Sequence, residues 1–170
     1  IGLKSMQPDV ERPAAIVLTP KQDWAEGTPP AWSELEAKLG LALPDDYKRI
    51  VTLYGTGQWQ GFWFMLNPFT QNRFLNLWLQ CQTGERGQTT KLDAERYIRD
   101  SLPDFEYPHP IYPEPGGILP WASTDNGGNF FWLTKGPPNS WKTIYYADRS
   151  FEFEEYDRSC SRLLFGAVSG

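Results

Sequence analysis

The sequence predicts an α+β domain, and three observations lead to this class. The chain has 170 residues, the size of one ordinary domain. Apolar residues make up 40% of it, so it can build a core, while 15 glycines and 15 prolines favour a loop-rich, sheet-containing fold over a helical bundle. Helical patterns come first along the chain and strand patterns follow, an order typical of helices segregated from an antiparallel sheet.

We divide the chain into an N-terminal arm, residues 1–29, and a single domain, residues 30–170. The arm is interrupted by prolines and shows no sustained period, although an apolar run at 14–18 predicts a short strand. The longest apolar runs have five residues, whereas a membrane helix needs about 20. The chain also has no secretory-leader pattern. We therefore expect a cytoplasmic protein without membrane contact, whose Cys81 and Cys160 are reduced and buried.

The first helix of the domain is predicted from a single apolar face. Trp32, Leu35 and Leu39 recur at i, i+3 and i+7, which is helical spacing. Pro30 suits a first turn, and Gly40 suits the position just past the end. We expect Trp32 and Leu35 to be buried against the sheet.

The second helix is predicted directly afterwards. Asp45 and Asp46 stand in its first turn, where the helix dipole favours negative charge. Four apolar residues then follow at helical spacing, and a glycine ends the pattern: Tyr47, Ile50, Val51, Tyr54 and Gly55. The two helices therefore form a corner with a four-residue connection.

The middle of the chain is expected to hold one strand and two further helices. Residues 59–66 are aromatic-rich and predict a strand with a bend at Gly61. Residues 72–83 predict a third helix. Residues 92–101 predict a fourth, with Tyr97 and Ile98 turned inward.

The last third of the chain is expected to form the sheet. Residues 103–120 hold six prolines and should run extended along the surface. Residues 125–128, Asp-Asn-Gly-Gly, are a strong tight-turn sequence. Strands are predicted at 118–122, 129–134, 143–147 and 151–156, and a short helix at 159–165 that ends at Gly166.

Charge is distributed unevenly along the chain, whose net charge is −5. Residues 100–134 contain five acids and no Lys or Arg, and residues 148–157 contain five acids against Arg149. Nucleic-acid binding needs clustered basic side chains, so direct nucleic-acid binding is not expected. An acidic face instead suits a basic protein partner.

The sequence offers little catalytic chemistry. His109 is the only histidine, and it stands between Pro108 and Pro110 in what we expect to be an exposed loop. That is a poor place to hold a general base, and without it no Ser-His-Asp or Cys-His arrangement exists. Glu154 and Glu155 are neighbours on a predicted strand and so should face opposite sides, although two acids from distant segments could still meet as in a glycosidase. We expect no enzyme, no cofactor and no metal.

The segments resemble a known family in their order and spacing. The first half contains Trp32-x-x-Leu35-Glu36-x-x-Leu39-Gly40-x-x-Leu43-Pro44-Asp45-Asp46-Tyr47-Lys48, then Tyr54-Gly55-x-Gly57. The second half contains Gly116-Gly117-Ile118-Leu119-Pro120-Trp121-Ala122, then Asn126-Gly127-Gly128-x-x-Phe131-Trp132, then Trp141. Over residues 30–166 this resembles the SUKH superfamily, in particular the branch with the fungal cell-wall-synthesis regulator domain. A Pro-rich insert at 84–115 departs from the pattern.

The resemblance implies a mixed or antiparallel sheet with flanking helices, and it implies a function. Bacterial members are typically immunity proteins of polymorphic toxin systems, which bind and neutralise a co-encoded toxin, often a nuclease. The matched residues are scaffold residues and do not identify an interface. The resemblance therefore implies an immunity protein. The acidic charge of the chain favours a basic toxin as its partner, and we expect a monomer when free. The alternatives are a scaffold or peptide-binding regulatory module and, third, a small hydrolase.

We assign the candidate partner-binding residues from charge alone. They fall into two acidic groups, Asp104, Glu106 and Glu114 in the Pro-rich insert, and Asp148, Glu152 and Glu154 near the last predicted strand. Glu152 and Glu154 should share one strand face because they are two residues apart.

Overall fold

The computed structural model describes residues 31–59, 62–85, 88–148, 150 and 152–168. The predicted arm, its strand at 14–18 and the bend at Gly61 lie outside the described residues. The elements are α1 (Trp32–Leu39), α2 (Asp45–Tyr54), β1 (Gln58–Trp59), β2 (Trp63–Met65), α3 (Leu77–Gln80), α4 (Lys91–Ser101), β3 (Ile118–Thr124), β4 (Asn129–Leu133), η3 (Pro138–Ser140), β5 (Lys142–Tyr146), β6 (Phe153–Tyr156) and α5 (Cys160–Val168).

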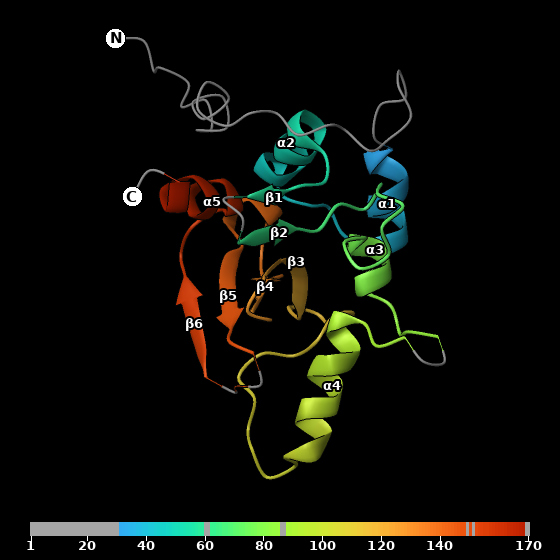
Figure 1. Ribbon diagram of the computed structural model, residues 1–170. Coiled ribbons are helices and arrows are strands. Elements are labelled where there is room, and N and C mark those ends of the chain that lie inside the picture. Colours follow the sequence, from blue (N-terminus) through green and yellow to red (C-terminus); the bar gives the residue numbers. More distant parts are fainter. Residues whose placement is uncertain (1–30, 60–61, 86–87, 149, 151, 169–170) are drawn as a thin grey trace.

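The sheet is a six-stranded antiparallel meander in the order β1-β2-β3-β4-β5-β6 (Figure 1). Each strand pairs antiparallel with the next one along the chain. The α-helices lie before β1, between β2 and β3, and after β6 along the chain. The predicted α+β class is therefore confirmed, with an antiparallel sheet. The edge strands are β1 and β6.

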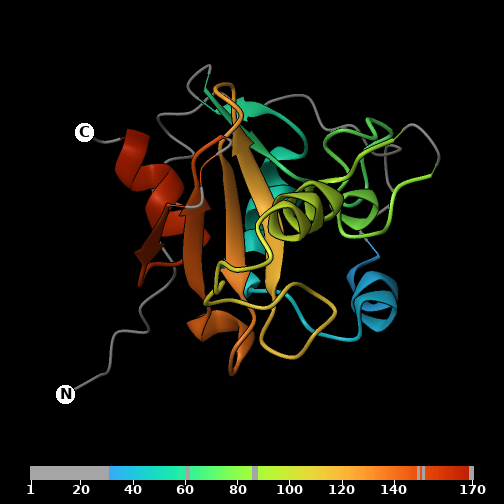
Figure 2. The same ribbon diagram turned by 90° about the horizontal axis from the view of Figure 1, so that it is seen from below.

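The two faces of the sheet are covered by different helices. Figure 2 shows α4 in front of the strands and α2 behind them. On the α2 face, Trp132 lies 4.8 Å from Tyr47 and 5.9 Å from Trp121, measured between ring centroids. All three residues are fully buried. This aromatic face is the main hydrophobic core of the domain.

Trp32 is less buried than the sequence suggested. Leu35 is in the core, but Trp32 is partly exposed and packs edge-on against Tyr47 and Phe69 at the border of the core. Helix α1 begins at Trp32, and Gly40 ends it with a left-handed φ of 71°. Its single apolar face is therefore split between the core interior, at Leu35 and Leu39, and the core margin at Trp32.

Helix α2 connects to the C-terminal helix through one carboxylate. Asp45 is exposed, as expected of a first-turn acid, but Asp46 is buried. Its Oδ2 accepts a hydrogen bond of 3.0 Å from the backbone N–H of Ser161 in the first turn of α5. Helix α5 continues through Gly166 to Val168, past its predicted end.

The third predicted helix is reduced to α3, a single turn. Side-chain oxygens of Asn72 and Asn76 accept hydrogen bonds from the backbone N–H groups of Phe74 and Leu79. Local side-chain acceptors of this kind compete with helical hydrogen bonds, so residues 72–76 form turns and Asn76 becomes the N-cap.

The predicted strand at 59–66 is a short hairpin instead. Trp59 pairs with Trp63 across β1 and β2, and β2 then pairs with β3. The composition of an aromatic-rich run does not distinguish one continuous strand from two short strands of a hairpin. The choice is decided by pairing with β3, which is remote in sequence.

Helix α4 forms as predicted, but its inward face is different. Tyr97 is 75% exposed, whereas Leu92 and Glu95 are buried. The face turned toward the sheet is therefore partly ionic, and hydrophobic periodicity cannot detect such a face.

Candidate functional site

The connection from α4 to β3 packs closely against the domain, contrary to the extended surface course that the prolines suggested. His109, Ile111 and Tyr112 are all buried. The guanidinium of Arg99 donates to the His109 carbonyl at 2.5 Å, and that of Arg96 donates to the Tyr112 carbonyl at 3.2 Å. Prolines prevent regular structure here, but they do not prevent burial when neighbouring side chains satisfy the free carbonyls.

Tyr112 fixes the other end of this connection. Its hydroxyl donates to the carbonyl of Leu39 at 2.7 Å, across 73 positions of sequence. Gly117 follows, and its carbonyl accepts hydrogen bonds from both the backbone N–H and the hydroxyl of Thr134. The connection is therefore held to α1, to α4 and to the loop after β4.

His109 is only 5% exposed, so its expected exposure was wrong. Its ring packs edge-on against Phe153 at 4.9 Å, and its Nε2 lies 4.0 Å from Oε2 of Glu155. Burial lowers the pKa of His109, and this outweighs the opposing effect of Glu155. The imidazole joins the connection to strand β6 and is not presented to a substrate.

Beneath α4, ionisable groups are buried among apolar side chains, since Tyr146 packs against the fully buried Phe131 at 5.9 Å. Burial raises the pKa of Glu95, and Arg99 one turn later partly offsets that rise. Burial also raises the pKa of Tyr146, to about 12. Glu95, Arg99 and Tyr146 therefore influence one another's charge on the α4 face of the sheet. No sequence pattern indicated that these groups would lie together.

The hydrogen bond of Lys91 to a distant strand was not predicted from the sequence. Lys91 is the first residue of α4, and its ammonium donates a 2.7 Å hydrogen bond to the side-chain oxygen of Asn129 at the start of β4. Burial lowers the pKa of Lys91 to about 8. Thr90 and Asp93 form a capping box at the same helix end, and that signal was visible in the sequence.

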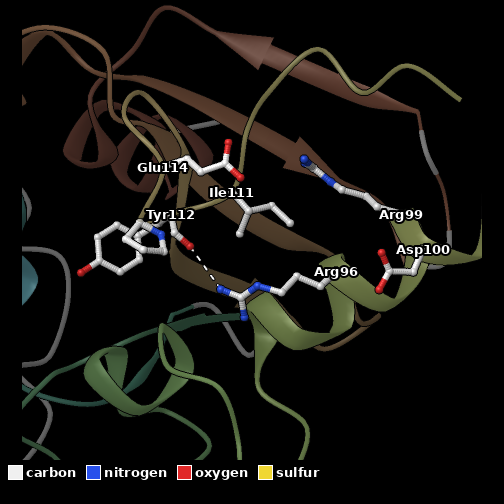
Figure 3. Close-up of a pocket in the computed structure, with 7 residues that line it drawn as sticks. Arg96, Arg99, Asp100, Ile111, Tyr112 and Glu114 are labelled. Atoms are coloured by element: carbon white, nitrogen blue, oxygen red, sulfur yellow. Dashed lines mark hydrogen bonds between the residues drawn. The ribbon is translucent and has the colours of Figure 1, made fainter. Parts of the chain in front are cut away.

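A pocket of about 310 Å³ opens between α4 and the 111–114 segment (Figure 3). Arg96 also pairs with Asp93 at 3.1 Å. Arg99 binds the His109 carbonyl through one nitrogen, whereas its buried Nε and Nη2 have no hydrogen-bond partner among the described residues. The pocket thus carries side chains of both signs of charge. Its lining consists of Arg96, Arg99, Asp100, Ile111, Tyr112, Pro113 and Glu114.

The first acidic group is exposed but does not form a single cluster. Asp104 and Glu106 lie in the exposed turn after α4, whereas Glu114 lies at the pocket with Asp100. Within the described part of the chain, no ion pair joins Asp104, Glu106 or Glu114 to a cation. Their charges are therefore presented to solvent.

The second acidic group is exposed as well, and its members differ in their surroundings. Glu154 pairs across the ladder with Tyr145, and Glu155 with Ile144, so the two neighbours face opposite sides of the sheet as expected. Glu154 accepts a hydrogen bond from the hydroxyl of Tyr156. Glu152 precedes the first residue of β6, and Asp148 lies beside Gly127 at the β3–β4 turn.

The structure brings parts of the two groups onto neighbouring elements. The contact between His109 and Phe153 lays the connection after α4 against the start of β6. Figure 1 shows both segments at the lower end of the molecule, away from α1 and α2. The connection that carries Asp104 and Glu106 therefore lies against the start of β6, which Glu152 precedes, whereas Glu114 lines the pocket.

The described residues contain neither a cluster of metal ligands nor a helix that could span a membrane. No three His, Cys, Asp or Glu side chains in that part of the chain gather as a metal site. No helix described there combines the length and the apolar character that crossing a bilayer requires. Cys81 and Cys160 are free and buried, as predicted.

Comparison with known proteins identifies the scaffold. Neither the curated proteins nor the solved structures include a match to the chain. A family model described as SUKH_6, SMI1-KNR4 cell-wall, matches residues 30–164, which span helices α1 to α4 and every strand of the sheet and end within α5. The chain therefore belongs to the SUKH_6 family of SMI1-KNR4 domains.

Proposed function

We propose that this protein is an immunity-type binding protein that neutralises a cognate bacterial toxin by covering the toxin's active site or substrate groove. Family membership is consistent with an immunity protein and also with a regulator of the SMI1-KNR4 kind. The observation that favours the first is the surface at the lower end of the domain. There, exposed carboxylates that form no ion pair with any described cation lie on a connection that is held by hydrogen bonds from Arg96 and Arg99.

The charge of this surface sets the chemistry of the partner. Toxins that cut nucleic acids bind phosphates and so carry basic grooves. A rigid acidic surface resembles the phosphate backbone in charge, and it attracts such a groove over long distances. The protein acts in the cytoplasm by binding and has no catalytic step of its own. It is a monomer when free. Its histidine serves to join two segments, and its carboxylates Glu154 and Glu155 face opposite sides of the sheet.

The test is co-expression with the toxin encoded directly beside this gene. Cells that produce the toxin should survive only when this protein is present. The purified proteins should form a 1:1 complex by light scattering, and the toxin's activity should fall in proportion to complex formed. A toxin that kills equally well in its presence and shows no complex would overturn the proposal.

A second candidate is a non-catalytic regulator of cell-wall synthesis that binds peptide segments. The family description, which names the cell wall, favours it. It predicts no toxin gene beside this one, and a growth or cell-shape defect on deletion without any toxin present. The two candidates are therefore separated by the same deletion and co-expression experiments.

A further inference from the structure

The end of α4 and the turn after it form a continuous exposed segment, which we name the α4 tip, residues 100–106. All seven residues are exposed to solvent. Two are apolar, Leu102 and Phe105, and Phe105 is 45% exposed. Three are acidic, Asp100, Asp104 and Glu106. Figure 1 shows this turn at the lowest point of the molecule.

The α4 tip has a defined shape although it is exposed. The backbone N–H of Phe105 donates to the carbonyl of Leu102 at 3.0 Å, which closes the turn. The Phe105 ring packs edge-on against Tyr107 at 4.8 Å, and the Arg99 guanidinium lies 4.7 Å above the Tyr107 ring. A surface ordered before binding loses less conformational entropy when a partner docks on it.

Among the described residues, no ion pair joins a carboxylate of the α4 tip to a cation. The two cations nearest in sequence, Arg96 and Arg99, donate their hydrogen bonds to the connection, and Arg96 also pairs with Asp93. No Lys or Arg occurs between residues 100 and 134. A partner that presents Lys or Arg side chains to this surface would therefore supply its missing counter-charges.

The combination of exposed apolar side chains with neighbouring carboxylates distinguishes the α4 tip from the surroundings of another exposed aromatic ring, Phe74. Phe74 is 75% exposed, but it follows Arg73 in a turn without acidic neighbours. Tyr97, equally exposed, stands one helical turn before Ser101 and extends the apolar surface beside the α4 tip. Exposed aromatic side chains bordered by polar groups are typical anchors of protein interfaces.

We propose that the α4 tip is the anchor of the toxin interface, with Phe105 and Leu102 inserted in an apolar socket of the toxin and Asp104 and Glu106 paired with Lys or Arg at its rim. This inference rests on the proposed function. It assigns the toxin contact to the first acidic group, at Asp104 and Glu106. It adds Leu102 and Phe105, two apolar residues that an analysis of charge alone does not identify. Glu114, which lines the pocket, is outside this interface.

The test measures binding kinetics of folded variants against the neighbouring gene's toxin domain, inactivated at its active site. Phe105→Ala should weaken affinity by about 30-fold, mainly through faster dissociation, as is usual for an aromatic anchor. Asp104→Lys with Glu106→Lys should slow association by about 10-fold at low salt. Hydrogen exchange in the complex should show protection of residues 97–107.

Matched controls separate the α4 tip from general effects. Phe74→Ala removes a phenyl ring that is more exposed than that of Phe105. Glu34→Lys with Glu85→Lys changes the net charge by the same amount on other surfaces. Both controls should bind within about 2-fold of wild type, since exposed residues outside an interface contribute little to affinity. Unchanged melting temperatures would show that all variants are folded.

Each other outcome overturns the proposal in its own way. If wild type binds the toxin domain but the α4 tip variants bind equally well, the anchor is elsewhere and the proposed function stands. If Glu152→Lys with Glu154→Lys is the weakened variant, strand β6 is the interface. If wild type does not bind at all, both proposals fail. If Phe105→Ala instead abolishes self-association of the free protein, the α4 tip is covered by a second copy.

Discussion

Lys91 shows how a single buried charge can connect two elements at a cost. Its ammonium joins the first turn of α4 to the start of β4 through Asn129. The same burial lowers its pKa to about 8 from the usual 10.5 of a lysine, because the charged form has lost solvation. The folded protein therefore releases this proton at lower pH than the unfolded chain does.

The pH dependence of stability follows from that difference. Between pH 8 and 10.5 the unfolded chain binds more protons at Lys91, so the free energy of unfolding should rise with pH across this window. Lys91→Met should remove the rise, which has an upper limit of about 3 kcal/mol. Urea unfolding at several pH values measures it. Lys38→Met, at an exposed position on α1, is the control and should keep the wild-type pH profile; equal profiles for Lys91→Met and wild type would contradict the assignment.

At the scale of elements, the connection between α4 and β3 depends on one glycine for close approach. A Cβ placed on Gly117 would lie 2.5 Å from the backbone nitrogen of Tyr112 and 2.8 Å from the carbonyl oxygen of Glu114. Both obstacles are backbone atoms, so a side chain cannot be accommodated by a rotamer change. Gly117 thus sets how tightly the 111–114 segment folds back on β3.

Gly117→Ala should therefore destabilise the domain by about 1–3 kcal/mol, the usual cost of overpacking. It should also increase amide exchange in residues 109–114, because the Arg96 and Arg99 hydrogen bonds to this segment would be disturbed. Gly166→Ala is the matched control, since nothing lies within 4 Å of a Cβ there. Within helix α5 that change should be neutral or stabilising. Equal melting temperatures for the two variants would refute the argument.

The elements also show what a sequence can and cannot predict. Helix α2 and strands β3, β4 and β5 were predicted because their apolar spacing and the tight turn at 125–128 are local signals. The β1–β2 hairpin and the burial of His109 depend on partners more than 40 residues away, namely β3 and β6. The acidic character of the candidate site could be predicted by counting charged residues along the chain. The exposure of Phe105 could not, because an apolar residue in an aperiodic segment gives no sign of which way it faces.

At the scale of the whole molecule, the net charge of −5 should govern how fast a basic partner arrives. The association rate with the inactivated toxin domain should fall at least 10-fold between about 0.01 and 0.15 M salt, because the Debye length shrinks from about 30 Å to about 8 Å. The dissociation rate should change much less, since it depends on short-range contacts. Stopped-flow fluorescence provides both rates, and a salt-independent association rate would show that long-range attraction is not used.

The hydrogen bonds that hold the connection have a consequence for changing recognition while keeping the fold. They involve the carbonyls of His109 and Tyr112 and the hydroxyl of Tyr112, none of which lies in residues 102–106. The aromatic core packs on the opposite face of the sheet, against α2. The five residues 102–106 can accordingly be exchanged for other sequences as a cassette, and a library randomised only there would sample new binding specificities on an intact scaffold.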